Sequence, residues 1–194
     1  MIGVILCGGK STRMGTDKGL IRLPLQTWAQ AAADKMAQLQ LPVLLSINTL
    51  QYPDYSSLFD ANQLIADSAS LDIKGPLGGV LSIHENYPMQ DLFVLACDMP
   101  LVQVDILKQL LEIYHHDNTP DAFVFTNDGE PEPLCAIYSA RGLTHIRQLY
   151  QSGQLPRHSM KFVIEHINTV FEPLTEPQKR YFENFNSHTP SNDL

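Results

Sequence analysis

Short apolar runs alternate along this chain with longer segments whose apolar residues recur at helical spacing. The clearest run, residues 92–97 (LFVLAC), is apolar throughout and stops abruptly at Asp98-Met99-Pro100. A strand that is apolar on both faces belongs to a sheet that helices cover on each side. The alternation therefore predicts an α/β fold with a mostly parallel, Rossmann-like sheet and helices on both faces.

The predicted strands span residues 2–6, 43–47, 63–66, 92–97, 122–125, 134–138 and 168–171. The predicted helices span residues 27–39, 77–85, 105–115, 140–150 and 160–164. A length of 194 residues fits one domain, so we expect a single domain over residues 1–194, with a tail at 185–194 that need not be ordered. Ligands of such sheets bind beyond the carboxyl ends of the strands. We therefore expect the loops at residues 7–19, 48–53, 67–79 and 98–104 to converge.

Charge and cysteine content narrow the class of protein. A net charge of −8 repels nucleic acid and anionic membranes, so we expect neither as a partner. The three cysteines, Cys7, Cys97 and Cys135, form no Cys-x-x-Cys pair and are interpreted as small buried residues in a reducing compartment. No apolar run approaches the roughly 18 residues of a membrane span. These features predict a cytoplasmic protein.

The segment at residues 6–19 (LCGGKSTRMGTDKG) follows the first predicted strand and contains Gly-Lys-Ser. A nucleoside-triphosphate P-loop would require glycine where Val4 stands, so that interpretation fails. Adjacent Gly8 and Gly9 do not fit the dinucleotide-binding spacing Gly-x-Gly-x-x-Gly either.

What remains is a glycine-rich loop that carries Lys10, Arg13 and Lys18 against the single acid Asp17. Glycines let backbone N–H groups approach an anion, and the cations add charge. A plain surface turn is the alternative, but the density of cations at a strand's carboxyl end favours phosphate binding.

These residues belong to an ordered set of motifs. The set comprises LCGG at 6–9, RMG at 13–15, DK at 17–18, SIN at 46–48, IADS at 65–68, GPLGG at 75–79, CDMP at 97–100 and FNSHTP at 185–190. Spread over nearly the whole chain, it resembles the signature of the molybdenum cofactor guanylyltransferases, within the nucleotidyltransferase superfamily.

The resemblance implies a reaction. GMP would pass from GTP to the terminal phosphate of molybdenum-molybdopterin, giving the guanine dinucleotide cofactor and pyrophosphate with the help of Mg²⁺. GTP and molybdenum-molybdopterin would be the substrates, with transient contacts to molybdopterin-handling proteins and molybdoenzymes. Two alternatives stay open. One is a related nucleotidyltransferase that uses CTP or a sugar phosphate, and the other is a non-catalytic nucleotide-binding accessory protein.

The resemblance also assigns roles to residues. Arg13, Lys18 and Asp98 are the catalytic candidates, because positioning and charge stabilisation around phosphate oxygens are the main demands of nucleotidyl transfer. Asp98 is the candidate Mg²⁺ ligand, since Mg²⁺ uses one or two carboxylates and completes its shell with phosphates and water. An isolated aspartate before Met-Pro could equally be a turn residue. The implied nucleotide contacts are Leu6, Cys7, Gly8, Gly9, Lys18, Asn48, Asp67, Gly78 and Asp98.

Specificity and the second substrate depend on fewer residues. Gly8, where the cytidylyl branch usually has alanine, leaves room for a purine and favours guanine. Asp67 could accept hydrogen bonds from guanine or meet the ribose, and both readings stay open. Residues Glu132, Pro133, Arg157 and Asn186 would lie on the molybdopterin side. After Lys18-Gly19 the chain is about three residues shorter than the family pattern, so we expect the hairpin there to be short or absent.

Overall fold

The computed structural model describes residues 1–8 and 17–182. The strands are β1 (Ile2–Leu6), β2 (Val43–Ile47), β3 (Leu64–Ala66), β4 (Leu92–Ala96), β5 (Ala122–Asn127), β6 (Glu130–Tyr138) and β7 (Thr169–Pro173). The α-helices are α1 (Trp28–Ala37), α2 (Tyr52–Tyr55), α3 (Pro76–Asn86), α4 (Val104–His116), α5 (Ala140–Gln151), α6 (Met160–Ile164) and α7 (Glu176–Lys179). The 3₁₀ turns are η1 (Lys18–Leu20), η2 (Thr49–Gln51), η3 (Ala61–Gln63) and η4 (Arg180–Phe182).

The seven strands of the described residues form one sheet in the order β3-β2-β1-β4-β6-β5-β7. Neighbouring strands are parallel except where β6 pairs with β4 and with β5. The strands β1 to β4 therefore deliver their carboxyl ends to one edge of the sheet. The predicted α/β class with a mostly parallel sheet is confirmed.

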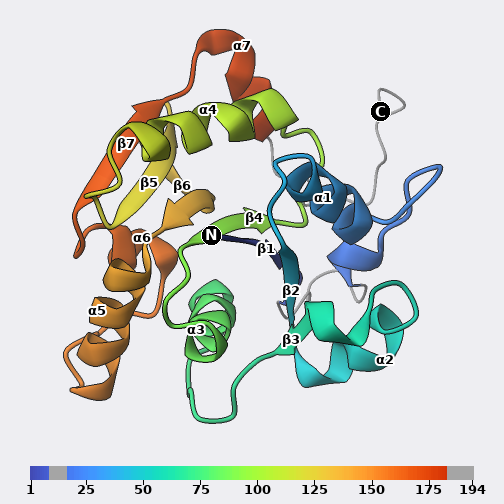
Figure 1. The fold of residues 1–194 in the computed structure, drawn as a ribbon, viewed down its shortest axis with the longest axis horizontal. Coiled ribbons are helices and arrows are strands. Elements are labelled where there is room, and N and C mark those ends of the chain that lie inside the picture. The colour runs from blue at the N-terminus through green and yellow to red at the C-terminus, as the bar shows by residue number, and fades with distance from the viewer. Residues whose placement is uncertain (9–16, 183–194) are drawn as a thin grey trace.

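Two apolar layers, one on each face, hold the sheet between its helices (Figure 1). Helices α1 and α4 pack on one face with Ile5 of β1, and helices α3, α5 and α6 pack on the other face with Val4 and Leu6. Successive residues of a strand point to opposite faces, so an apolar run such as β1 supplies both layers. The sequence pattern of unbroken apolar strands follows from this double coverage.

Local sequence signals explain where several elements begin and turn. Thr27 accepts a hydrogen bond from the Gln30 backbone N–H (3.3 Å) while Gln30 Oε1 accepts from the Thr27 N–H (2.9 Å), so a capping box starts α1. Strands β5 and β6 are joined at Asp128 and Gly129, whose φ angles are 52° and 81°. Positive φ at both turn residues is typical of a type I′ hairpin, for which Asp-Gly is a preferred pair.

Most element bounds differ from the sequence-based expectation by one to three residues; larger differences occur at β6 and at two short helices, and the segment after Lys18 agrees with the expectation. Strand β6 begins at Glu130 rather than at residue 134, because residues 130 and 131 pair with Asn127 and Thr126 of β5. The short helices α2 and α7 were not predicted, since four residues carry no readable periodicity. The hairpin after Lys18 is reduced to one antiparallel bridge between Arg22 and Thr27, as its shortened sequence predicts.

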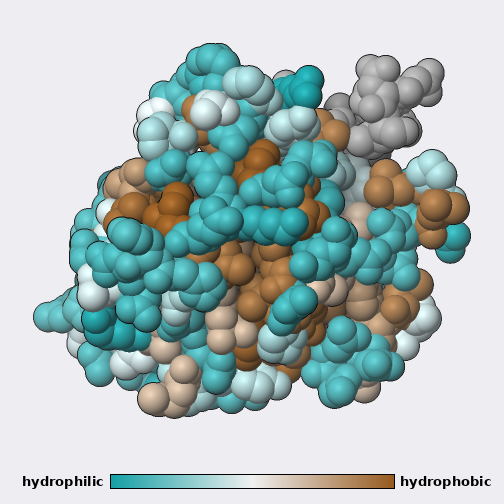
Figure 2. All heavy atoms as spheres, turned by 45° about the horizontal axis from the view of Figure 1, so that its top comes forward, coloured by the Kyte–Doolittle hydropathy of each residue, from teal (hydrophilic) through white to brown (hydrophobic). Residues whose placement is uncertain are grey.

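One face of the molecule is hollowed. Figure 2 shows hydrophilic residues around a hollow where hydrophobic residues gather.

Cys7, Cys97 and Cys135 are free thiols buried inside the protein, as predicted. Within residues 1–8 and 17–182, no helix combines the length and apolar character required to cross a bilayer.

Candidate functional site

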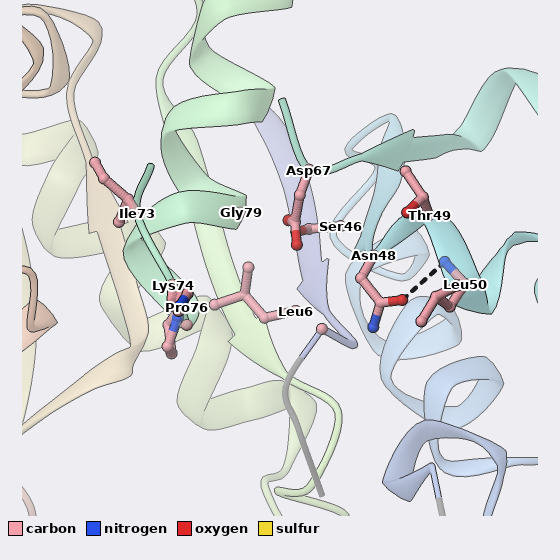
Figure 3. A pocket seen from close by; sticks show the side chains of 12 residues that line it. Leu6, Ser46, Asn48, Thr49, Leu50, Asp67, Ile73, Lys74, Pro76 and Gly79 are labelled. Carbon is pink, nitrogen blue, oxygen red and sulfur yellow. Dashed lines mark hydrogen bonds between the residues drawn. The ribbon is translucent and has the colours of Figure 1, made fainter. Parts of the chain in front are cut away.

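A pocket of about 410 Å³ opens at the carboxyl ends of β1, β2 and β3. Figure 3 shows Asp67, Ser46 and Asn48 on one side of it and Ile73, Lys74 and Pro76 on the other. The lining residues are Leu6, Gly8, Ser46, Asn48, Thr49, Leu50, Asp67, Ile73, Lys74, Gly75, Pro76 and Gly79. Predicted loops from three separate parts of the sequence therefore meet here, because parallel strands end at one edge.

Asn48 shapes the pocket wall and also caps the turn that follows it. Its Oδ1 accepts hydrogen bonds from the backbone N–H groups of Leu50 (2.9 Å) and Gln51 (3.2 Å). The side chain is thus both an Asx-type capping residue and part of the pocket, which combines the two readings of its sequence position. Because Oδ1 is used for capping, the amide nitrogen is the group that Asn48 can offer a ligand.

Asp67 continues the pairing of β3 with β2, since its N–H donates to the Ile47 carbonyl (2.9 Å). Its carboxyl group lies at the pocket wall, where partial burial raises its pKa from the ordinary 3.8. A carboxylate in this position can accept hydrogen bonds from a nucleoside, either at the base or at the ribose hydroxyls.

The opposite wall is the N-terminus of α3. Gly75 precedes this helix with a φ of 84°, and Pro76 occupies its first turn. The first N–H groups of a helix have no partner within the helix and carry partial positive charge. This end of an 11-residue helix therefore favours an anionic or electron-rich ligand in the pocket.

The glycines of the site serve two different purposes. A Cβ on Gly8 would come no closer than 3.9 Å to the Asn48 nitrogen, so Gly8 leaves space toward the pocket. A Cβ on Gly79 would lie 2.2 Å from Ser46 Oγ, and one on Gly78 would lie 2.4 Å from the Ile73 carbonyl oxygen. Gly78, predicted as a nucleotide contact, does not line the pocket but lets α3 pack closely on the preceding loop.

Lys18 and Asp98 form an ion pair beside the ends of β1 and β4, with 2.9 Å between Nζ and Oδ2. The two residues are separated by 80 positions in the sequence and are only 21% and 22% exposed at their side chains. Lys18 starts η1, and Asp98 closely follows β4. The predicted cationic turn and the predicted acidic residue are therefore in direct contact.

The loop that carries Asp98 has a second cationic anchor. Lys35 of α1 donates from Nζ to the Pro100 carbonyl oxygen (2.5 Å). Burial lowers the pKa of Lys35. The contact ties the loop after β4 to a helix that packs on the sheet.

The end of β1 is held by backbone hydrogen bonds. The Cys7 and Gly8 N–H groups both donate to the Ser46 carbonyl, at 2.9 and 3.2 Å, and Cys97 N–H donates to the Leu6 carbonyl at 3.2 Å. Leu6 and Gly8 line the pocket, but the Cys7 side chain is buried in the core and does not. Leu6, Cys7 and Gly8 were all predicted as nucleotide contacts. Cys7 helps to build the site through its backbone hydrogen bond to Ser46, while its side chain packs in the core.

Several predicted residues lie elsewhere or outside the described part. Gly9, Arg13 and Asn186 lie outside the described residues. Glu132 and Pro133 belong to β6, and burial raises the pKa of Glu132.

Leu95 pairs with Cys135 near the end of β4, so residues 130–134 extend past β4 on the side where Asp98 lies. Arg157 lies between α5 and α6 with its guanidinium 6.0 Å from the centre of the Phe162 ring, away from the pocket lining.

Thr49, Leu50, Ile73 and Lys74 line the pocket although the sequence did not single them out. Each lies close in the sequence to Asn48 or Gly75, and this closeness was the only sign in the sequence that they would line the pocket.

Within residues 1–8 and 17–182, no group of three or more His, Cys, Asp or Glu side chains forms a metal site. A lone carboxylate such as Asp98 suits Mg²⁺, which takes few protein ligands and binds substrate phosphates as well.

Comparison with known proteins adds to this geometry. The family described as MobA-like NTP transferase domain matches residues 3–170. This chain belongs to that family.

A probable molybdenum cofactor guanylyltransferase from Methanothermobacter thermautotrophicus is 30% identical over 94% of this chain and 92% of the relative. One from Flavobacterium johnsoniae is 27% identical over 98% of this chain and 94% of the relative. The resemblance read from the motifs is therefore confirmed.

The fold has a counterpart among solved structures. Molybdopterin-guanine dinucleotide biosynthesis protein A from Archaeoglobus fulgidus matches with a TM-score of 0.76 and 23% identity, over 97% of this chain and 93% of that chain. This match shows that the two chains share the same arrangement of sheet and helices.

Proposed function

We propose that this chain transfers GMP from GTP to the terminal phosphate of molybdenum-molybdopterin and releases pyrophosphate. Membership of the MobA-like NTP transferase family supports this reaction class. The observation that carries it is the Lys18–Asp98 pair, in which a cation and a carboxylate from distant segments meet 2.9 Å apart at the edge of the sheet that bears the pocket.

The pocket is the proposed site of the guanosine moiety. Asp67 and the Asn48 amide nitrogen provide an acceptor and a donor on one wall, and the N-terminus of α3 lies on the other. Gly8 leaves the space that a purine needs. A pocket with apolar walls and a few convergent polar groups is typical of nucleotide and cofactor sites.

We assign the triphosphate of GTP to Lys18 and Asp98, which lie at the same edge of the sheet as the pocket. An oxygen of the acceptor phosphate attacks the α-phosphorus, the new P–O bond forms, and the bond to the β-phosphate oxygen breaks, so negative charge grows on the leaving pyrophosphate. Lys18 stabilises that charge electrostatically. Asp98 would hold Mg²⁺, which supplies charge neutralisation at the phosphates when bound.

Molybdenum-molybdopterin would approach from the side of β6. Residues 130–134 extend past the end of β4 on the side of Asp98, and this position supports a contact between Glu132 and the acceptor. We assign the pterin-side contacts to this region and to Arg157, and the reaction itself to the cytoplasm, where thiols such as the buried Cys7 and Cys97 stay reduced.

The direct test is a transfer assay. The purified chain is incubated with labelled GTP, Mg²⁺ and molybdenum-loaded molybdopterin, and the product is analysed for a guanine dinucleotide and for pyrophosphate. Parallel reactions contain CTP in place of GTP, or EDTA. Formation of a cytosine dinucleotide instead would overturn the guanine assignment, and tight GTP binding without any transfer would identify a non-catalytic binding protein.

A further inference from the structure

The side-chain amide of Gln51 joins three segments that build the site. Gln51 Nε2 donates to the Cys7 carbonyl oxygen (3.0 Å) and to Asp17 Oδ2 (2.6 Å), and Gln51 Oε1 accepts from the Asn48 N–H (2.8 Å). Cys7 follows β1, Asp17 precedes Lys18, and Asn48 belongs to the pocket wall. One planar group therefore connects the ends of β1 and β2 to the turn that carries Lys18.

The chemistry of the three partners fixes the orientation of this amide. The Asp17 carboxylate and the Cys7 carbonyl only accept hydrogen bonds, and the Asn48 N–H only donates. A side chain that fits all three must carry two donors and one acceptor in the geometry of a primary amide. Both hydrogens of Nε2 and the Oε1 atom of Gln51 are thus committed to these contacts.

Asp17, which Gln51 holds in place, in turn fixes the position of Lys18. Its Oδ1 accepts from the Gly19 N–H (2.9 Å) and from the Tyr55 hydroxyl (3.1 Å), so the carboxylate caps η1, the turn that begins with Lys18. Tyr55 is fully buried, and burial raises the pKa of its hydroxyl, which stays protonated and donates. With both carboxylate oxygens held, the start of η1 has a defined place relative to Asp98.

Gly19 is required for the same arrangement. A Cβ on Gly19 would lie 2.1 Å from the Tyr55 hydroxyl oxygen. The residue after Lys18 must therefore be glycine if Tyr55 is to reach Asp17.

We propose that Gln51 is a positioning residue of this site, which sets the place of the Lys18 ammonium by fixing Asp17 against the ends of β1 and β2. The inference deepens the proposed function and rests on it for the role of Lys18. Gln51 acts through Asp17 and touches no reacting atom. Misplacing a phosphate-stabilising cation by about 1 Å costs up to about 10²-fold in rate.

The substitution Gln51→Glu tests this role with almost no change of shape. The new carboxylate can still accept from the Asn48 N–H, but it faces the Asp17 carboxylate and the Cys7 carbonyl without a donor. Repulsion from Asp17 raises the pKa of the introduced carboxyl above its ordinary value of about 4.3. When it is protonated at low pH, it can again donate to Asp17.

The first measurement needs no substrate. Hydrogen exchange at the Gly19 amide, which Asp17 caps, is followed in wild type and variant from pH 8 to pH 5.5. At pH 8 the protection of this amide should fall about tenfold in Gln51→Glu, and the ratio to wild type should recover as the pH falls. The matched control is Gln63→Glu, because Gln63 Oε1 accepts from the Asp60 N–H (3.3 Å) in a similar turn, η3.

The second measurement follows guanylyl transfer. For Gln51→Glu at pH 8 we expect kcat to fall at least tenfold, with the KM for GTP changed less than threefold and with recovery toward low pH, while Gln63→Glu matches wild type. If Gln51→Glu proves unable to fold, Tyr55→Phe removes one hydrogen bond to Asp17 and should shift both readouts in the same direction by a smaller factor.

Unchanged Gly19 protection at pH 8, or a loss of equal size at every pH, would overturn the positioning role. A wild-type chain that forms no guanine dinucleotide would instead refute the proposed function. The exchange measurement would still decide whether Gln51 holds Asp17 and the start of η1.

Discussion

The parallel strands β3, β2, β1 and β4 and the antiparallel strand β6 reach the same edge of the sheet in opposite directions. In the half made by β3, β2, β1 and β4, all strands are parallel, and the site residues directly follow their carboxyl ends. In the other half, β6 runs antiparallel to β4, so it is the beginning of β6 that extends past the end of β4. The expectation that ligands bind beyond the carboxyl ends of strands therefore predicts the nucleotide side of the site. It does not predict the side formed by β6, because β6 begins at this edge.

The largest loss of activity is expected from a substitution at Asp98, which lies shortly after β4, the last of the four parallel strands. We expect Asp98→Asn to lower kcat about 10³-fold, since the proposed Mg²⁺ ligand is lost while the shape is kept. The measurement is the rate of guanine dinucleotide formation. The control is Asp105→Asn, because Asp105 also pairs with a lysine (3.3 Å to Lys108) but is 92% exposed. Equal rates in the two variants would refute the assignment.

Lys18→Met should lower kcat by about 10² to 10³-fold through the loss of charge stabilisation at the phosphates. The free energy of unfolding should fall by about 1 to 3 kcal/mol, because the substitution removes the lysine partner of the Asp98 carboxylate, which is only 22% exposed. Denaturant titration measures the second quantity. Lys108→Met removes the lysine of the exposed pair and should leave both quantities as they are in wild type.

Asp67→Asn should weaken GTP binding by about 10- to 100-fold, because a carboxylate acceptor for the nucleoside is lost. The raised pKa of Asp67 gives the effect a direction with pH: wild-type affinity falls as acidification protonates the carboxylate, and stays high above its pKa. The amide introduced by the substitution does not titrate, so the variant's affinity should vary less over the same acidic range. Calorimetry between pH 4.5 and pH 8 measures both, and parallel pH profiles would contradict the role of Asp67.

Gly8→Ala should weaken GTP binding by about three- to tenfold and leave CTP binding nearly unchanged, since the added methyl group enters pocket space and, among residues 1–8 and 17–182 other than its chain neighbour, comes no closer than 3.9 Å to an atom. The melting temperature should match wild type. Gly79→Ala is the contrasting variant, because its Cβ would lie 2.2 Å from Ser46 Oγ, and its melting temperature should fall. Equal losses of GTP and CTP affinity in Gly8→Ala would remove the argument for guanine from this position.

The smallest effects on nucleotide binding are expected at Glu132 of β6 and at Arg157, which lies between α5 and α6. Glu132→Gln and Arg157→Gln should leave GTP affinity within about twofold of wild type and raise the KM for molybdenum-molybdopterin by a few-fold, as interactions at a site's periphery do. Steady-state kinetics with each substrate varied in turn separates the two quantities. A large loss of GTP affinity in either variant would contradict the assignment of these two residues to the molybdopterin side.

Sequence patterns predicted the parallel half well for a physical reason. Strands such as β1 and β4 are buried on both faces and therefore carry unbroken apolar runs that end sharply at a polar loop. The start of β6 (Glu130-Pro131-Glu132) carries the opposite signal, because prolines and acids are disfavoured in strands, and pairing with β5 overrides that preference.

The role of Gln51 had a weak signal of its own. Asn48 and Gln51 have the spacing of a capping box, in which each side chain bonds the other's backbone N–H, and both bonds are present. The spacing indicates a local turn. It gives no sign that the same amide also reaches Cys7 and Asp17, which are 44 and 34 positions away.

Short segments of the chain were enough to predict the fold class and the loops that form the site, because strand burial, glycine content and charge are local properties. The candidate roles of Lys18, Asn48, Asp67 and Asp98 came from the resemblance of the motifs to a known family. Two findings needed the folded chain: Gly78 packs while Gly8 stays open, and Gln51 joins the ends of β1 and β2 to Asp17. The approach of Lys18 to Asp98 was predicted from the convergence of the strand ends, and the structure adds their direct contact at 2.9 Å. Contacts between segments depend on how the strands are ordered and aligned in the sheet, and that order arises from the packing of the whole chain.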